Sequence, residues 1–393
     1  MKTDDSKLML EKNSKVQQLF LMGGFVGFTA SFAGFFYDKS QFYFSYLTAF
    51  SFWLSIALGA LFLIMLHHLT GSIWSVALRR LYENLAIVLP WFAVMFLVIV
   101  FGNQTLFHWT HADRVATDPL LQSKSPYLNL PFFIVRGALY FLVWGILAHL
   151  FHRSSAKQDE SLTDSPLHNV RRTSAPGIIL YAFTISFASF DWLMSLDAHW
   201  YSTIFGVYFF SGSTLAALAF TTFIIIILHR QGYLKGIITV EHFHDLGKLL
   251  FTFTVFWAYV AFSQYFLIWY ANIPEETIWF QHRWVGNWKL LSYFLVIGHF
   301  VVPFFILMIR ASKRSTLLLS LMTLWLLLMH WIDLYWIIQP SLHHEGFHLS
   351  WMDAVTFIAI GSMFLWLFLK KASQRALVPI RDPQLSSSVQ HRN

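Results

Sequence analysis

Residues 44–67 have the sequence FSYLTAFSFWLSIALGALFLIMLH, an apolar stretch without a single Asp, Glu, Lys or Arg. A helix needs about 20 mostly apolar residues to cross a bilayer. Lipid offers no hydrogen-bond partner to the backbone, so the helix must satisfy its own N–H and C=O groups. This stretch is therefore predicted to span a membrane.

The same criterion identifies ten membrane spans along the chain. They are predicted at 17–36, 44–67, 84–106, 130–152, 175–194, 203–229, 245–272, 288–311, 316–338 and 352–369. Hydrophobic residues make up 56% of the chain and charged residues 12%, against about 25% charged in soluble proteins. The sequence therefore predicts an all-α integral membrane protein whose main solvent is the lipid bilayer.

The distribution of positive charge predicts the orientation. Most of the 27 Lys and Arg residues fall in connections on the side of both termini, and only Lys39, Arg114, Lys124 and Arg283 fall in the opposite connections. Because Lys and Arg favour the cytoplasmic side, the N-terminus (1–16) and the tail (370–393) are predicted to be cytoplasmic. The net charge of +7 follows from this bias, and no nucleic-acid surface is expected because the cations are dispersed.

Two polar segments and the absence of cysteine lead to further expectations. Residues 153–174 are predicted to form the longest cytoplasmic linker, and 379–393 a disordered tail. No cleaved signal peptide is expected, because the span at 17–36 lacks a short apolar core with a small-residue cleavage site. The chain has no cysteine, which excludes thiolate-held iron–sulfur clusters and covalently attached c-type haem, and we expect no metal site here.

An internal repeat links spans two to five with spans six to nine. The words IMLH at 64–67 and IILH at 226–229 match, as do YFLVWG at 140–145 and YFLVIG at 293–298. The same alignment places Glu83 on Asp245, Arg136 on Lys289 and Asp191 on Asp333. Because each matched pair of spans runs in the same direction, we predict two parallel four-helix bundles, 44–194 and 203–338, flanked by peripheral spans at 17–36 and 352–369.

The repeated acids divide into two kinds. Glu83 and Asp245 open their predicted helices, where a carboxylate caps free N–H groups, and Lys248 one turn after Asp245 can pair with it. With His242 nearby, a proton-collecting mouth is the alternative. Asp191 and Asp333 instead fall near helix C-termini, where the helix dipole disfavours an anion.

Charges at membrane depth are costly, and they usually mark functional sites or buried pairs. Arg136 is the predicted partner of Asp191, and Lys289 that of Asp333. A structural ion pair and a proton path are both compatible with this pattern.

Two further histidines fall inside predicted spans. His299 lies near the middle of span eight and His330 one turn before Asp333. They are candidates for proton carriers, for hydrogen-bond partners of a quinone or for haem ligands. Haem is the weakest candidate because no second histidine faces His299 at matched depth. A histidine satisfied by a hydroxyl or a carbonyl group is the structural alternative.

Specific sequence motifs then indicate a family. FDWLMSLDAHWYS at 190–202 closes span five, and span seven contains DLGKLLF at 245–251, FWAY at 256–259 and FSQY at 262–265 before WYANIPEET at 269–277. Over nearly its whole length the chain resembles the NrfD-like, polysulfide reductase-type membrane subunits of bacterial alternative complex III. The closest resemblance is to the second of the two such subunits in that complex.

This resemblance implies a partner set in the bacterial inner membrane. Such complexes oxidise quinol in a respiratory or photosynthetic chain and pass electrons through iron–sulfur and c-type haem subunits. The main quinol site is assigned to the sister NrfD-like subunit. We therefore expect no catalytic residue and no bound cofactor in this chain, although a quinone could bind beside Arg136 and Asp191 or beside His330 and Asp333.

The expected function is a scaffold with two polar half-channels for protons. The candidates toward the cytoplasm are Glu83, His242, Asp245 and Lys248, with His299 at mid-depth. The candidates toward the outside are Arg136, Asp191, Asp197, His199, His330 and Asp333. The alternatives are an anchor with its own outer-face quinone site, an independent secondary transporter and an inert structural anchor.

Overall fold

The structure, a computed structural model, describes residues 8–160 and 165–392. Within these ranges the regular secondary structure is helical apart from one isolated bridge, and ten helical spans are long and apolar enough to cross a membrane. All ten predicted spans are confirmed. The chain is therefore a multi-pass membrane protein.

The spans are built from the following elements, several of which are interrupted. They are α1 (Lys15–Tyr37), α2 (Lys39–Thr70), α3 (Val76–Ala86) with α4 (Leu89–Phe101), α8 (Leu130–Glu160), α9 (Ser165–Trp192) with η3 (Met194–Asp197), α10 (Phe205–Arg230), α11 (Val240–Ala271), α13 (Trp288–Leu295) with the π-helix η4 (Val296–Val301) and α14 (Val302–Met308), α16 (Thr316–Ile338) with η5 (Gln339–Ser341), and α17 (Trp351–Ala372). The connecting helices are α5 (Asn103–Leu106), η2 (His108–Thr110), α6 (Ala112–Thr117), α7 (Pro119–Lys124), α12 (Pro274–His282), α15 (Arg310–Arg314) and α18 (Leu385–Val389).

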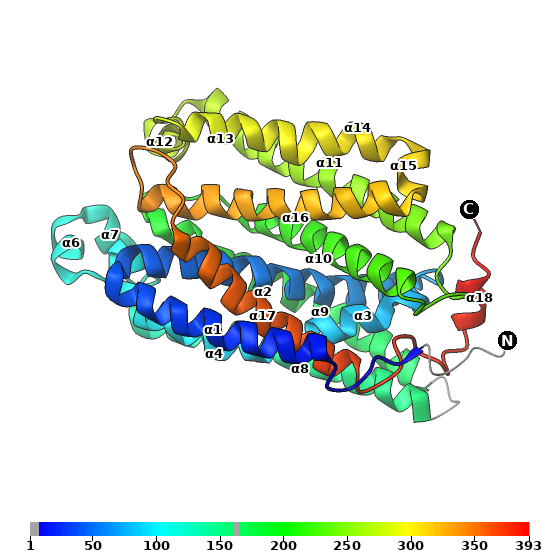
Figure 1. The fold of residues 1–393 in the computed structure, drawn as a ribbon. Coiled ribbons are helices and arrows are strands. Elements are labelled where there is room, and N and C mark those ends of the chain that lie inside the picture. Colours follow the sequence, from blue (N-terminus) through cyan, green and yellow to red (C-terminus); the bar gives the residue numbers. More distant parts are fainter. Residues whose placement is uncertain (1–7, 161–164, 393) are drawn as a thin grey trace.

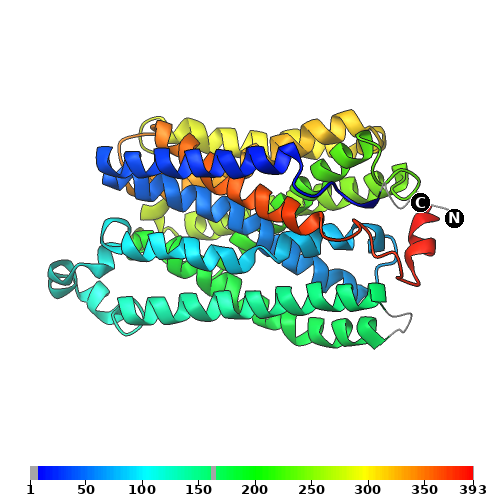
Figure 2. The same ribbon diagram turned by 60° about the horizontal axis from the view of Figure 1, so that its bottom comes forward.

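The two ends of the bundle differ. Both ends of the described chain lie at one end, together with α18, which we call the tail end (Figure 1). The opposite end carries α6, α7 and α12, and we call it the loop end. The turned view shows the same separation (Figure 2).

Eight of the spans form two four-helix bundles, as predicted. In the first, α2 packs on α3, α4, α8 and α9, and α8 packs on α4 and α9. In the second, α10 packs on α11 and α16, while the η4-containing span packs on α11 and α16. The peripheral helices α1 and α17 pair with each other and lie against α2.

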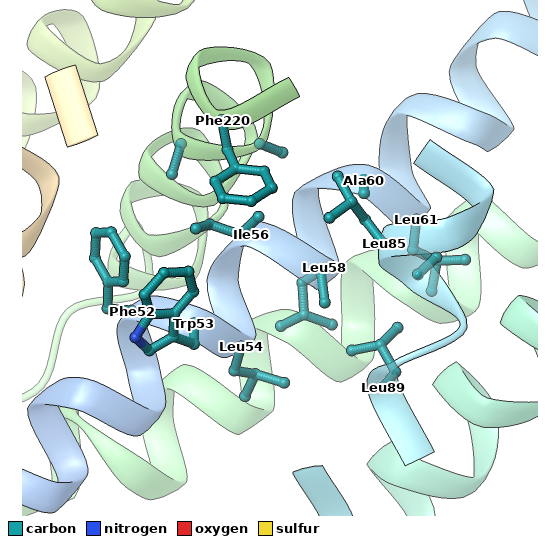
Figure 3. Packing of buried hydrophobic residues seen from close by; sticks show 14 of the residues in the cluster. Phe52, Trp53, Leu54, Ile56, Leu58, Ala60, Leu61, Leu85, Leu89 and Phe220 are labelled. Carbon is teal, nitrogen blue, oxygen red and sulfur yellow. The ribbon is translucent and has the colours of Figure 1, made fainter. Parts of the chain in front are cut away.

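The two bundles meet along α2 and α10. Small residues bring these helices together, because a Cβ added to Gly59 would lie 2.7 Å from Ala217 Cβ and 2.8 Å from the Ser213 carbonyl carbon. Small side chains allow helix backbones to approach closely in a membrane, where packing replaces the hydrophobic effect. Around this contact α2 is almost wholly buried, with Ile56 and Leu58 in the core (Figure 3).

The two predicted polar segments are more ordered than expected, and the prediction of a disordered tail was wrong. Most of the linker expected at 153–174 is helical, since α8 continues to Glu160 and α9 begins at Ser165; residues 161–164 lie outside the described part. The tail expected to be disordered folds back onto the tail end, where the Ser388 hydroxyl donates to Trp74 O at 2.9 Å. The tail contains buried polar groups with partners, which hydropathy alone does not reveal.

Candidate functional site

The Arg136–Asp191 pair is a closed polar site inside the first bundle. Arg136 Nε and Nη2 donate to the two carboxylate oxygens of Asp191 at 2.8 and 2.9 Å, and the Tyr140 hydroxyl donates to Oδ2 at 2.7 Å. Both charged residues are buried, Asp191 completely. The predicted pairing is thus confirmed, and Tyr140, one helical turn from Arg136, is a partner that the sequence reasoning missed.

The guanidinium of Arg136 is held on its other side as well. Its Nη1 donates to Tyr127 O at 2.8 Å, and its Cζ lies 3.8 Å from the Tyr127 ring centroid and 4.3 Å from that of Phe132. A bidentate pair with further hydrogen bonds and stacking has the geometry that a buried ion pair needs for stability. A 360 Å³ pocket lined by Tyr127 and Ser195 lies beside it, at the loop end.

The second bundle does not repeat this arrangement. The predicted Lys289–Asp333 pair is wrong, because Lys289 is exposed and its Nζ lies over the Trp284 ring. Asp333 instead accepts a short hydrogen bond from the Tyr208 hydroxyl on α10 and one from Trp257 Nε1 on α11 at 3.1 Å. Asp333, buried and with no cation among these partners, differs in chemistry from Asp191.

Two buried histidines lie close to this carboxylate. His299 stacks on Trp257 with ring centroids 3.9 Å apart and is fully buried, and neither of its ring nitrogens has a hydrogen-bond partner among the described residues. His330 Nε2 lies 2.8 Å from Ser55 Oγ. Because Ser55 already donates to Phe52 O, the hydroxyl accepts from Nε2–H, which leaves Nδ1 of a neutral His330 as a buried acceptor without a partner.

These unpaired nitrogens favour bound water or a proton carrier. An unsatisfied buried polar group costs about 1–3 kcal/mol, and native proteins relieve most such groups with ordered water. His299 also lies in the π-helix η4, a distortion often found at functional sites. We define Tyr208, Trp257, His299, His330 and Asp333 as the second-bundle cluster.

Glu83 lies at the tail end of the first bundle in a charged cluster. It lies well inside α3, so the expected capping role is wrong, and its Oε1 is 3.2 Å from Arg79 Nε. Arg79 also binds Asp382 of the folded tail at 2.8 Å and Gln158 at 3.0 Å. A pocket of 230 Å³ lined by His67, His68 and Arg79 lies beside this cluster.

Asp245, Lys248 and His242 lie at the tail end of the second bundle. The predicted Asp245–Lys248 pair is confirmed at 2.5 Å, and His391 of the tail lies 2.8 Å from Asp245 Oδ2. Thr239 and His242 cap α11 instead of Asp245, whose capping role was wrongly expected. His242 is buried, with Nδ1 used in the cap and Nε2 unpartnered.

Asp197 and His199 lie apart from the two buried sites. Asp197 Oδ2 is 3.7 Å from His282 Nδ1, and the exposed His199 lies 2.5 Å from Asp118 Oδ2. The hydrogen bond with His199 lowers the pKa of the Asp118 carboxyl. Nearby, burial lowers the pKa of Lys124, whose Nζ donates to Ala198 O at 2.5 Å.

Arg283 is a buried cation that the sequence reasoning counted only as a loop charge. It donates to Trp336 O at 3.0 Å, to Trp279 O at 2.8 Å and to Ile337 O at 2.7 Å. It thereby satisfies carbonyls at the C-terminus of α16, where a cation is favourable. Burial lowers its pKa to about 9, so it remains charged at neutral pH.

Among the described residues no group of three or more His, Asp or Glu side chains is placed to hold a metal ion. Comparison of the chain with models of protein families and with curated proteins found no match. Function must therefore be argued from the site. The structure pairs Arg136 with Asp191 and Asp245 with Lys248, gathers His299, His330 and Asp333 in the second bundle, and leaves Glu83, Asp197 and His199 in separate clusters.

Proposed function

We propose that this protein is a membrane subunit of a quinol:electron-acceptor oxidoreductase of the alternative complex III type, and that its second bundle carries protons. The observation that carries the proton proposal is the second-bundle cluster. Within the part of the chain that the structure describes, a carboxylate without a cationic partner and histidine nitrogens without a hydrogen-bond partner lie together inside the second bundle. Polar groups of this kind are energetically costly inside a membrane, so they usually mark a functional site.

The groups in this bundle allow a path with a defined direction. Asp245, Lys248 and His242 lie where α11 begins at the tail end, His299 lies at the middle of its span, and Asp333 lies toward the loop end. Water on the unpaired nitrogens of His299 and His330 would connect neutral imidazoles that can both accept and release a proton. We place the tail end in the cytoplasm because of the Lys and Arg bias.

The first bundle has a different role in this proposal. Arg136 holds Asp191 with two hydrogen bonds and Tyr140 supplies a third, so the carboxylate has little capacity left for a transferred proton. We assign this pair to the scaffold. The proposed membership of a redox complex rests on the sequence motifs of span seven. The lack of cysteine is compatible with it, because iron–sulfur and c-type haem centres would then belong to partner subunits.

Two matched substitutions test the proton path. The variants Asp333→Asn and Asp191→Asn are expressed in the source organism, and the membrane complex that contains each variant is isolated. Quinol turnover and proton uptake per electron are then measured in liposomes. We expect Asp333→Asn to lower the proton-to-electron ratio while assembly is retained, and Asp191→Asn to reduce the yield of assembled complex. An assembled Asp333→Asn complex with full turnover and an unchanged ratio would refute the path.

Complex membership has its own test. Gentle purification through an affinity tag on this chain is expected to recover haem-containing and iron–sulfur-containing subunits, visible by absorbance and metal analysis. Recovery of the chain alone, in a membrane that expresses it normally, would favour an independent transporter and overturn the assignment.

A further inference from the structure

A polar pocket of about 230 Å³ lies at the tail end of the first bundle, where α2 ends and α3 begins. Its wall also includes the start of α9 and part of the folded tail, and the helices that form it can be followed in Figure 1. Its lining includes His67, Ser72, Ser75, Arg79 and Arg171. The pocket is separate from the second-bundle cluster, so it has no part in the proposed proton path.

The charge of the lining favours an anion. The lining contains two arginines and three histidines and no Asp or Glu. Arg79 is held by Glu83 and Asp382, neither of which lines the pocket, at 3.2 and 2.8 Å, so its charge is shared with two carboxylates. Arg171 is exposed and forms no ion pair with a described residue, so it supplies the uncompensated positive charge. Its guanidinium presents a planar fork of N–H donors that fits phosphate and carboxylate groups.

The start of α3 adds a backbone donor. Ser75 is the residue before the helix, and its hydroxyl donates to Ser72 O at 3.0 Å instead of capping the helix. Ser75 is 1% exposed, and its backbone N–H has no hydrogen-bond partner among the described residues. The first N–H groups of a helix lack partners within the helix and carry the positive end of its dipole, so helix N-termini commonly bind phosphate.

Two side chains in the lining contain buried polar atoms without a partner. His67 is 7% exposed, and neither its Nδ1 nor Ser72 Oγ has a hydrogen-bond partner among the described residues. The His67 ring packs against the rings of Trp74 and Tyr82, with centroids 5.9 and 5.6 Å away. A buried polar atom without a partner costs about 1–3 kcal/mol. Because an imidazole and a hydroxyl can both donate, a ligand with several acceptor oxygens would relieve this cost.

The pocket lies where three membrane spans have their ends. The span of α2 ends at Thr70, that of α3 and α4 begins at Val76, and that of α9 begins at His168. The ends of spans lie in the head-group zone that flanks the hydrocarbon core. Phospholipid phosphates and phosphates dissolved in water both have access to this zone. One water takes about 30 Å³ in the liquid, so the pocket has room for a phosphate group with waters around it.

We propose that this pocket binds a phosphate group, held by the Ser75 N–H, the Ser72 hydroxyl, the His67 imidazole and the Arg171 guanidinium. The phosphate belongs either to an anionic phospholipid or to a soluble compound, and both present the same tetrahedral set of acceptor oxygens. Hydrogen bonds to a charged acceptor are roughly twice as strong as those between neutral groups. The site does not depend on the proposed role in an oxidoreductase, because none of these four residues lies on the proposed proton path.

Two neighbouring exposed arginines on α9 provide a matched test. The full-length protein, with the subunits that copurify with it, is purified in detergent and depleted of lipid as the wild type, Arg171→Gln, Arg171→Lys and Arg172→Gln. Native mass spectrometry counts bound dioleoyl phosphatidic acid and dioleoylglycerol, which share their chains and differ in the phosphate. Equilibrium dialysis measures the binding of radiolabelled inorganic phosphate. Both arginines are exposed and Arg172 does not line the pocket, so all four proteins should unfold at the same temperature without ligand.

We expect a phosphate probe to bind saturably, several-fold more weakly to Arg171→Gln, with intermediate strength to Arg171→Lys, which keeps the charge without the fork, and unchanged to Arg172→Gln. Binding of phosphatidic acid but not of dioleoylglycerol, undisplaced by excess inorganic phosphate, identifies a lipid as the source. Binding of inorganic phosphate that displaces phosphatidic acid identifies a soluble phosphate. In both cases hydrogen exchange at 71–76 should slow on saturation, because the Ser75 N–H gains an acceptor. No saturable binding of either phosphate probe, equal weakening by Arg171→Gln and Arg172→Gln, or unchanged exchange at 71–76 would overturn the proposal and leave the pocket to water alone.

Discussion

Removing one partner of the buried Arg136–Asp191 pair should destabilise the fold far more than removing both. In Asp191→Leu the guanidinium remains buried between the Tyr127 and Phe132 rings without its counter-ion. In Arg136→Met the fully buried carboxylate loses its counter-ion and keeps the hydrogen bond from the Tyr140 hydroxyl. Breaking a buried pair in this way costs about 3–5 kcal/mol, because a desolvated charge is left without compensation.

The double variant Arg136→Met/Asp191→Leu removes both charges. What remains are the Tyr140 hydroxyl without its acceptor and Tyr127 O without its donor. Each unsatisfied neutral group costs about 1–3 kcal/mol at most, whereas replacing both members of a buried ion pair by apolar residues is often neutral or stabilising. We therefore expect the double variant to be more stable than either single variant, which implies a coupling free energy of several kcal/mol.

Equilibrium unfolding by dodecyl sulfate in mixed micelles, followed by tryptophan fluorescence, provides the free energies of unfolding. Lys289→Met is the matched control, because Lys289 occupies the position of Arg136 in the repeat but is exposed, so we expect a change within about 0.5 kcal/mol. A double variant as unstable as the sum of the two single variants would show that the two charges do not depend on each other, and would refute the reasoning.

Three further predictions concern packing, the tail and pH. Gly59→Ala should lower the free energy of unfolding by about 1–3 kcal/mol, because its Cβ would overlap α10. Gly145→Ala is the control: its Cβ would lie 3.6 Å from Pro90 Cγ, so the change should be neutral or stabilising by up to about 1 kcal/mol. Ending the chain before Pro379 removes Asp382 from the buried Arg79 and should lower the thermal unfolding temperature, whereas ending it at His391 should leave it unchanged. The hydrogen bond with His199 lowers the pKa of the Asp118 carboxyl, so the pair stabilises the fold above pH 3.8 and this stabilisation is lost as the pH falls further. The difference in unfolding temperature between the wild type and His199→Asn should therefore become smaller below pH 3.8. A difference that becomes larger there would contradict the prediction.

Some of the tertiary contacts could be predicted because they depend on local sequence. Asp245 and Lys248 lie one turn apart on the same helix, so their pairing follows from helix geometry. Arg136 and Asp191 could be matched because both are charges at similar depth in neighbouring spans, where few other partners exist. Tyr140 could have been added by the same reasoning, since it lies one turn from Arg136 on the same face.

The partners of Asp333 could not be predicted in this way. The repeat suggested Lys289, but Lys289 and Tyr293 lie on a face of α13 that points away from the bundle. Arg136 and Lys289 thus occupy matching positions in the repeat, but their side chains do not point in matching directions. Tyr208 and Trp257 from other helices occupy the place of the expected cation.

The sequence by itself determined the solvent of this protein, its ten spans and its two bundles, because backbone hydrogen bonding in lipid forces every long apolar segment into a helix. Only the tertiary structure decided which charges are paired and that the tail folds onto Arg79 and Asp245. Those features depend on how helices rotate and cross, and that is set by side-chain packing between residues far apart in the chain.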